Sequence, residues 1–154
     1  MMRRLKYWKV YLLVAGILYL LVLARCHFVP LPMRKADAVM ELKLTGYCAC
    51  ARCCGWKYNW CGLPIYASGP LKDKFKIIGQ TASGKMARPG TVAVDPKVFP
   101  RGTRFYIPGY GWGVAHDVGG DIQGHHLDLF FWTHHFAEAW GVQNSSVKVW
   151  YPQD

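Results

Sequence analysis

The sequence predicts an all-β domain, a small closed barrel or sandwich of six strands with one short helix. Apolar runs of four to six residues recur between residues 42 and 151, and glycines and prolines separate them. Only one segment of this region has the pattern of a helix. Because closure leaves no unpaired edge strand, six short strands with so little helix favour a barrel. The six predicted strands are Leu42–Tyr47, Thr91–Val94, Arg104–Ile107, Gly113–His116, Leu127–Phe131 and Val147–Tyr151.

Residues 1–26 read as a signal peptide or signal anchor ahead of this domain. A basic leader precedes 15 uncharged residues, Val10–Ala24, which Arg25 closes. The positive-inside rule keeps the leader in the cytoplasm and places the domain outside. Val22 stands where a cleavage site needs a small residue, so we favour an uncleaved transmembrane helix over a cleaved signal. Arg25 also argues against lipidation of Cys26.

A connector, residues 27–43, leads to the barrel domain at residues 44–154. The formal charge of +10 is concentrated at the N-terminus, where seven of the 19 basic residues and none of the nine acids precede residue 36. The rest has 12 basic and nine acidic residues, which is no nucleic-acid footprint. It is compatible with an acidic polymer, and equally with a mixed solvated surface.

Five cysteines crowd into residues 48–61, and two interpretations compete. In an exported protein, closely spaced cysteines normally form disulfides that hold a loop with little core. Cys50 and Cys53 also have the spacing of metal ligands, but no second pair follows at zinc-ribbon distance. We favour disulfides and expect no metal. The cysteines are Cys48, Cys50, Cys53, Cys54 and Cys61, an odd number unless Cys26 joins them.

The segment after the cysteines, up to Thr91, is loop-like, with one possible strand at Lys74–Gly79. The single predicted helix of the domain lies at His134–Trp140. Thr133 is a suitable N-cap, and Gly141 supplies a left-handed (αL) stop. Five histidines fall within 20 residues from His116 to His135, but none has a firm ligand spacing, so the prediction is again no metal and no cofactor.

Three aspartates follow or interrupt apolar runs, where strands bring them to the rim of a sheet. Cleavage of a glycosidic bond requires carboxyl groups that lie close together, because one of them must deliver a proton to the leaving oxygen. Asp95 precedes a proline and Asp117 a Val-Gly-Gly turn, so each also fits a turn cap. Asp128 lies between leucines, where partial desolvation raises the pKa of a carboxyl and favours a general acid.

These segments resemble the three-aspartate (3D) domain of bacterial cell-wall lytic enzymes over about residues 44–150. They are also similar to the catalytic core of the membrane-bound lytic transglycosylase A family and, more remotely, to rare lipoprotein A-like proteins. Asp121 departs from the pattern, which usually has a small apolar residue there. The matching segments are AVDP (93–96), Pro-x-Gly-Thr (100–103), IPGYG (107–111), A-x-D-x-G-G (115–120) and LDLFF (127–131).

The resemblance implies a double-psi β-barrel that acts on peptidoglycan glycan strands in the cell envelope, as a monomer and without a cofactor. It implies a lytic transglycosylase in which Asp128 is first acid and then base, while Asp117 and Asp95 stabilise charge or hold substrate. The alternatives are an inverting hydrolase, with Asp117 as base, and a non-catalytic wall-binding module. The residues expected to bind substrate are Tyr47, Thr81, Gly119, Gly120 and His126.

Overall fold

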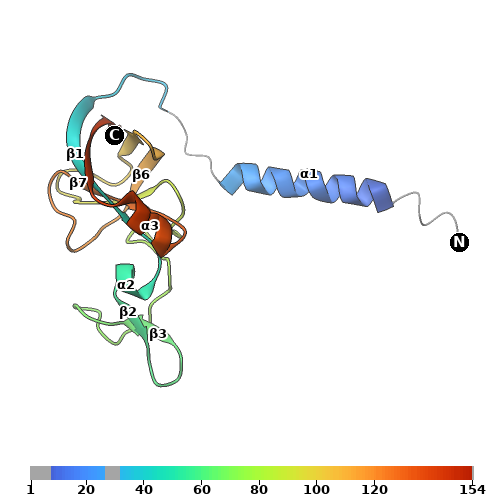
Figure 1. Cartoon of the computed structure of the whole chain (residues 1–154), viewed down its shortest axis with the longest axis horizontal. Coiled ribbons are helices and arrows are strands. Elements are labelled where there is room, and N and C mark those ends of the chain that lie inside the picture. The colour runs from blue at the N-terminus through green and yellow to red at the C-terminus, as the bar shows by residue number, and fades with distance from the viewer. Residues whose placement is uncertain (1–7, 27–31, 154) are drawn as a thin grey trace, which may run out of the picture. The chain divides into compact units, whose positions relative to one another are not determined.

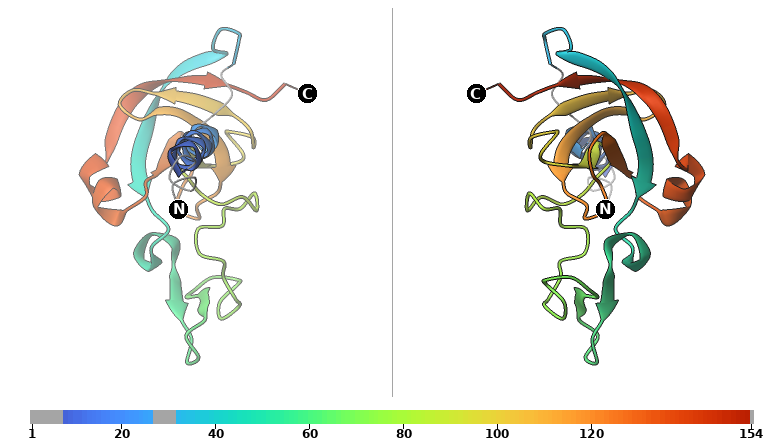
Figure 2. Two further views of the ribbon diagram at one scale, coloured as in Figure 1. Left: turned by 90° about the vertical axis from the view of Figure 1, so that its right-hand side faces the viewer. Right: turned by 90° about the vertical axis from the view of Figure 1, so that its left-hand side faces the viewer.

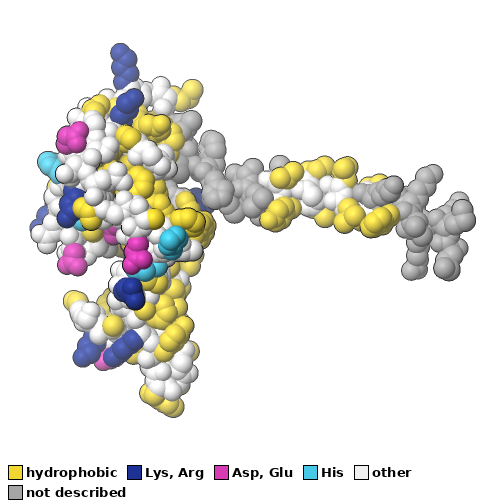
Figure 3. Space-filling view, in the orientation of Figure 1, with side chains coloured by type: hydrophobic (Ala, Val, Ile, Leu, Met, Phe, Trp, Pro, Cys, Tyr) yellow, Lys and Arg dark blue, Asp and Glu magenta, His cyan; other side chains and the backbone are white. Residues whose placement is uncertain are grey.

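The computed structural model describes residues 8–26 and 32–153, and the chain divides into two units, residues 1–30 and 31–154. The first contains helix α1 (Trp8–Cys26), whose visible side chains are mostly hydrophobic (Figures 1 and 3). Across the described residues, no helix combines the length and the apolarity that a membrane crossing requires. The leader residues Arg3, Arg4 and Lys6, and connector residues 27–31, lie outside the described residues.

The second unit is a closed barrel of six strands, as the sequence predicts (Figure 2). The β1–β7 and β4–β6 pairs are parallel, and the other four are antiparallel. The double-psi connectivity stays a prediction. In spatial order the strands are β1 (Ala38–Tyr47), β7 (His126–Phe130), β4 (Thr91–Val94), β6 (Gly111–Asp117), β5 (Arg104–Ile107) and β8 (Gln143–Trp150).

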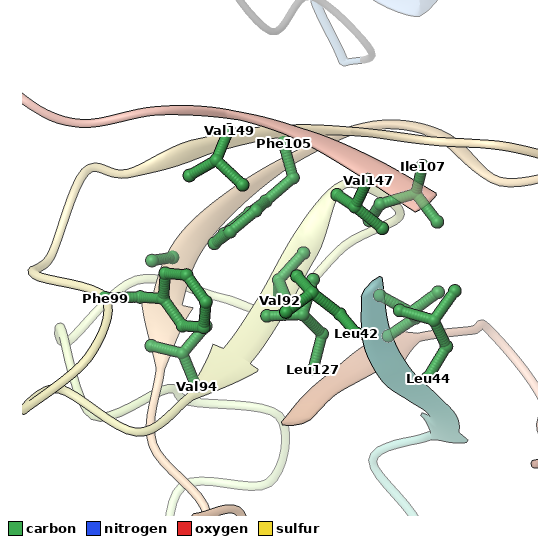
Figure 4. Packing of buried hydrophobic residues seen from close by; sticks show 12 residues of the cluster. Leu42, Leu44, Val92, Val94, Phe99, Phe105, Ile107, Leu127, Val147 and Val149 are labelled. Carbon is green, nitrogen blue, oxygen red and sulfur yellow. The ribbon is translucent and has the colours of Figure 1, made fainter. Parts of the chain in front are cut away.

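Alternating residues of these strands fill the barrel interior (Figure 4). Leu127 and Leu129 of β7 point inward and are fully buried, whereas His126 and Asp128, which alternate with them, are only partly buried. This is the period of two expected of a strand with one apolar face. Among the described residues, apolar side chains fill the barrel interior, so the polar side chains of β7 lie on its outer face. The other inward residues are Leu42, Leu44, Val92, Val94, Phe99, Phe105, Ile107, Ala115, Val147 and Val149.

Helix α3 (His134–Trp140) has the predicted bounds and N-cap, since the Thr133 side chain accepts a hydrogen bond from the Phe136 amide. Gly141 ends the helix with a positive φ of 67°, but its ψ of −149° differs from the predicted αL conformation. The helix packs against β1 at Gly46, where a Cβ atom would approach the Ala137 carbonyl oxygen to 2.9 Å. Glycine at this position lets helix and strand backbones come close.

The segment between β1 and β4 differs from the sequence prediction. It contains a four-residue helix, α2 (Ala51–Cys54), and a hairpin of β2 (Trp56–Tyr58) and β3 (Pro64–Tyr66). This extension projects from one end of the barrel (Figures 1 and 2). The strand expected at Lys74–Gly79 is wrong, since only an isolated bridge joins Phe75 to Ile65.

Truncation of a buried strand residue should destabilise the barrel far more than truncation in the extension. We expect Leu127→Ala to lower the free energy of unfolding by about 2–5 kcal/mol, because it removes packed methyl groups and leaves a cavity. Leu63→Ala is the matched control, since Leu63 is half exposed. Chemical denaturation of both variants measures the difference. Equal, small losses would contradict this assignment of the core.

Candidate active site

Two of the three predicted aspartates lie in one row across four neighbouring strands. Thr45 of β1 is in register with Asp128 of β7, and Asp128 is in register with Ala93 of β4. Ala93 is also in register with Asp117 of β6. Asp128 and Asp117 are thus two strand spacings apart, roughly 10 Å between Cα atoms. Ala93 stands between them in the row, and its side chain is only a methyl group.

A β-bulge turns Asp117 toward this row. The β4–β6 register shifts between Val92 and Ala93, so that Val92 faces Ala115 but Ala93 faces Asp117, and His116 is left over. Without the bulge, Asp117 would lie on the same face as the fully buried Ala115. Bulges commonly redirect side chains beside active sites. Here the extra residue moves a carboxyl from the interior face to the outer face.

The β1–β4 segment and the loop after β6 line an open cavity of about 540 Å³ beside this row. The barrel contributes Tyr47, Ala93, Asp117 and Asp128 to its lining. A volume of this size suits a small ligand or a few sugar units of a longer chain. The remaining lining residues are Cys53, Cys54, Gly55, Tyr66, Ser68, Leu71, Lys76, Gln80, Thr81, Ala82, Val118, Gly119, Gly120 and Asp121.

Asp128 has the environment of a carboxyl that holds a proton. Burial raises its pKa, and the nearby charge of Asp117 acts in the same direction, whereas a hydrogen bond from Thr45 opposes both. The Thr45 hydroxyl donates to Asp128 Oδ1 at 2.6 Å and lies 2.9 Å from His126 Nε2. Because the hydroxyl proton is used on Asp128, Nε2–H of His126 is the donor to Thr45. These contacts fix the orientation of the Asp128 carboxyl.

Asp117 has the opposite surroundings. Tyr47 donates its hydroxyl to Asp117 Oδ2 at 2.8 Å, and the Ala82 and Val118 amides each donate to Oδ1 at 2.9 Å. Burial, followed by the charge of Asp117, raises the pKa of Tyr47 well above its usual range, so the phenol keeps its proton. Three donors are therefore aimed at this one carboxyl. The two aspartates of the cavity therefore have different hydrogen-bonding roles.

Asp95 is not among the lining residues. It follows β4, and its two carboxyl oxygens accept the Lys97 and Gly124 amides, each at 2.9 Å. These bonds, Gly124 first, lower its pKa. The carboxylate thus joins the turn after β4 to the loop before β7, as in the turn-cap alternative. The structure brings Asp117 and Asp128 together and leaves Asp95 outside their cavity.

Four of the five residues expected to bind substrate line the cavity: Tyr47, Thr81, Gly119 and Gly120. His126 does not line it and instead contacts Thr45. Sequence reasoning missed Thr45, although its position two residues before Tyr47 places both on one face of β1. It also missed Ala93, whose small side chain in an otherwise bulky strand was the available signal.

The expected disulfides are not formed, and the five cysteines between residues 32 and 153 are free thiols. The side chain of Cys26 is outside the description. Burial raises the pKa of Cys53 to about 12 and that of Cys54 to about 11. Burial also acts to raise the pKa of Cys50, but the Cys53 amide and neighbouring thiols outweigh it and bring the value to about 7.

The fold and the site together define a class of protein: a small closed β-barrel with a candidate active site on its outer face. Two aspartates with different hydrogen-bond partners form the centre of that site. Residues 90–153 match the family model of the 3D domain, which confirms the predicted resemblance over this part of the chain. The match contains all three aspartates.

Two Bacillus subtilis (strain 168) proteins are similar in sequence. The "Cell wall-binding protein YocH" is 43% identical over 91 residues, 56% of this chain and 32% of the relative. The "Putative cell wall shaping protein YabE" is 35% identical over 75 residues, 46% of this chain and 18% of the relative. The chain thus spans a third or less of the length of either relative.

Two solved structures of MltA from E. coli are similar to the chain. One is 25% identical with a TM-score of 0.38 and covers 51% of this chain and 28% of that protein. The other, described as having a unique lytic transglycosylase fold, is 23% identical with a TM-score of 0.40 and covers 53% of this chain and 30% of that protein.

Replacing Asp128 and Asp95 with asparagine should change stability in opposite directions. The native pKa of Asp128 is raised, so wild-type stability falls as pH increases from about 4 through that pKa. Asp128→Asn removes this loss and should be more stable than wild type at pH 7. The native pKa of Asp95 is lowered, so its contribution is present above about pH 4 and lost as pH falls.

Asp95→Asn should therefore be less stable than wild type at pH 7, also because its amide group would face a backbone donor. Urea unfolding of the three proteins between pH 4 and pH 7 measures both effects. A shift of both variants in the same direction would contradict the difference between the two carboxyls.

Proposed function

We propose that this chain is a peptidoglycan lytic transglycosylase that cleaves the MurNAc-β-1,4-GlcNAc bond and leaves 1,6-anhydro-MurNAc ends. One observation carries the proposal: a partly buried carboxyl with a raised pKa, Asp128, faces a cavity of about 540 Å³ that it shares with Asp117. The 3D domain match and the wall-related names of both relatives support the substrate class. The same proposal includes the double-psi connectivity, which the two parallel strand pairs support.

Asp128 serves both steps of the reaction. As an acid it gives its proton to the glycosidic oxygen, the bond from that oxygen to C1 breaks, and GlcNAc leaves as the alcohol. Asp128, now a carboxylate, removes the proton from the muramyl 6-hydroxyl, whose oxygen forms the new bond to C1. The proton returns to Asp128, and the site is ready for another turnover.

Asp117 would stabilise positive charge at C1 between these steps. An ionised carboxylate across the Ala93 gap can do this without forming a bond to the sugar. Its three hydrogen-bond donors also favour the transglycosylase over an inverting hydrolase. In a hydrolase Asp117 would have to take a proton from water, and the Tyr47, Ala82 and Val118 donors compete for the electron pairs it would use.

The second candidate function is a non-catalytic wall-binding module. The name of the relative with 43% identity, a cell wall-binding protein, favours it, because that name mentions binding and no cleavage. The cavity suits a bound sugar in either case. Turnover is the property that separates the two.

Product masses after incubation with purified peptidoglycan test the proposal. We expect anhydro-muramyl products from the wild type and at least a 100-fold lower rate from Asp128→Asn, which keeps the shape but carries no proton, by the usual size of about 10²–10⁴ for a general acid. Asp73→Asn, which changes an exposed aspartate that does not line the cavity, is the control and should stay active. Reducing-end products would support the hydrolase. Retained binding with no products from the wild type would support the module.

We also propose that residues 1–26 hold the domain on the outer side of the cytoplasmic membrane. The support is the uncharged run Val10–Ala24, its basic leader and the helix that contains the run. Intact mass and N-terminal sequencing of protein from the membrane fraction should find the leader still attached. A mature start between Arg25 and Ala36, in protein released from the membrane, would show a cleaved signal instead.

A further inference from the structure

Three cysteines and one histidine come together beside the cavity. The sulfur atoms of Cys48, Cys50 and Cys53 and a ring nitrogen of His134 all lie within 4.8 Å of one another. Cys48 directly follows β1, Cys50 is the N-cap of α2, and Cys53 is within α2. His134 is the first residue of α3, more than 80 positions later in the sequence. The contact between the two segments is therefore made by tertiary folding alone.

The distances within this group are those of a tetrahedral zinc site. Zinc–sulfur bonds of about 2.3 Å and zinc–nitrogen bonds of about 2.0 Å separate two sulfurs by about 3.8 Å and a sulfur from a nitrogen by about 3.5 Å. Cys48 Sγ and Cys53 Sγ are 3.8 Å apart. His134 Nδ1 is 3.7 Å from Cys50 Sγ and 3.3 Å from Cys53 Sγ.

The backbone around Cys50 has the form of a metal-binding turn. The Cys53 amide points at Cys50 Sγ at 3.4 Å, and the Cys54 amide donates to the Cys50 carbonyl at 3.0 Å. Amide donors of this kind stabilise negative charge on the sulfur of a ligand. The two other cysteines of residues 48–61 have different partners. Cys54 Sγ contacts the Cys48 carbonyl, and Cys61 Sγ contacts the Asn59 side chain.

The imidazole of His134 is oriented for coordination. Its Nε2 lies 2.9 Å from Glu138 Oε1, one helical turn along α3. With the Nε2 proton donated to this carboxylate, Nδ1 presents its lone pair to the three sulfurs. A carboxylate behind the ring is the usual arrangement for a histidine that binds zinc. Arg52 Nη1 lies 4.0 Å from the same Glu138 oxygen and 3.4 Å from Nε2, and adds positive charge beside the pair.

We propose that Cys48, Cys50, Cys53 and His134 bind one Zn²⁺ ion in a closed, structural site. Three thiolates and one imidazole are a soft donor set that suits zinc and supply all four tetrahedral positions, which leaves none open for a substrate or water. The proposal revises the prediction of disulfides and no metal. It does not depend on the proposed glycan chemistry.

The ion would fix one wall of the cavity. Cys48 follows Tyr47, which donates to Asp117, and Cys53 itself lines the cavity. Through His134, zinc would join this wall to α3, four residues after the end of the strand that carries Asp128. Binding would therefore favour one arrangement of Tyr47 and of the extension over the barrel.

Metal analysis of the full-length chain tests the proposal. After expression with zinc and purification without chelators, we expect about one zinc per chain. Cys50→Ser and His134→Asn should lose most of it. The matched controls Cys61→Ser and His135→Asn, which change a cysteine and a histidine outside the group, should keep it. Zinc retained in both ligand variants would overturn the proposal.

Cobalt substitution of the wild type gives a second measurement that needs no variant to fold. Tetrahedral Co²⁺ with three thiolates should give intense visible bands and a near-ultraviolet thiolate charge-transfer band, and added Zn²⁺ should remove both. Thiol counting under denaturing conditions completes the test. Wild-type protein with neither zinc nor the cobalt spectrum, and with cluster cysteines joined in disulfides, would overturn the proposal.

Discussion

The pairing of β4 with β7 on one side and with β6 on the other is the constraint on which the site depends. Ala93 is the shared partner of Asp128 and Asp117, so the gap between the carboxyls is set by backbone hydrogen bonds and not by flexible side chains. The interior of the barrel is closed by apolar packing, which leaves the outer face as the place for polar chemistry. The strand register thus fixes the distance between the Cα atoms of Asp117 and Asp128.

Asp128 and Asp117 show which parts of a site the sequence can predict. The pattern Leu127-Asp128-Leu129 places the carboxyl outside by simple alternation, and its neighbours explain the raised pKa. The position of Asp117 depends on a bulge at His116, and strict alternation places its side chain inside. A one-residue irregularity of this kind leaves no periodic signal. The barrel strands and helix α3 were predictable because each follows a repeated local pattern. The bulge was not predictable because it interrupts such a pattern.

The extension after β1 was the least predictable part because its structure depends on distant partners. Its two-stranded hairpin is short, and α2 has no buried residue, so neither has an apolar pattern long enough to identify. In the sequence, the cysteines could be interpreted only by their spacing within residues 48–61. His134, the fourth member of the group, lies more than 70 positions after this range. A ligand supplied by another part of the fold cannot be found by local spacing. The sequence therefore favoured disulfides, because it did not show that a histidine lies beside the cysteines.

Strand β1 connects the two proposals. Thr45 donates a hydrogen bond to Asp128, and Tyr47 donates one to Asp117. Two successive outward-facing residues of one strand therefore bind both carboxyls. The next residue, Cys48, belongs to the proposed zinc site. Any shift of β1 along its axis would alter both hydrogen bonds together, because they share one backbone. Loss of the metal should therefore change the geometry at both acids at once, whereas loss of either hydrogen bond should leave the metal group in place.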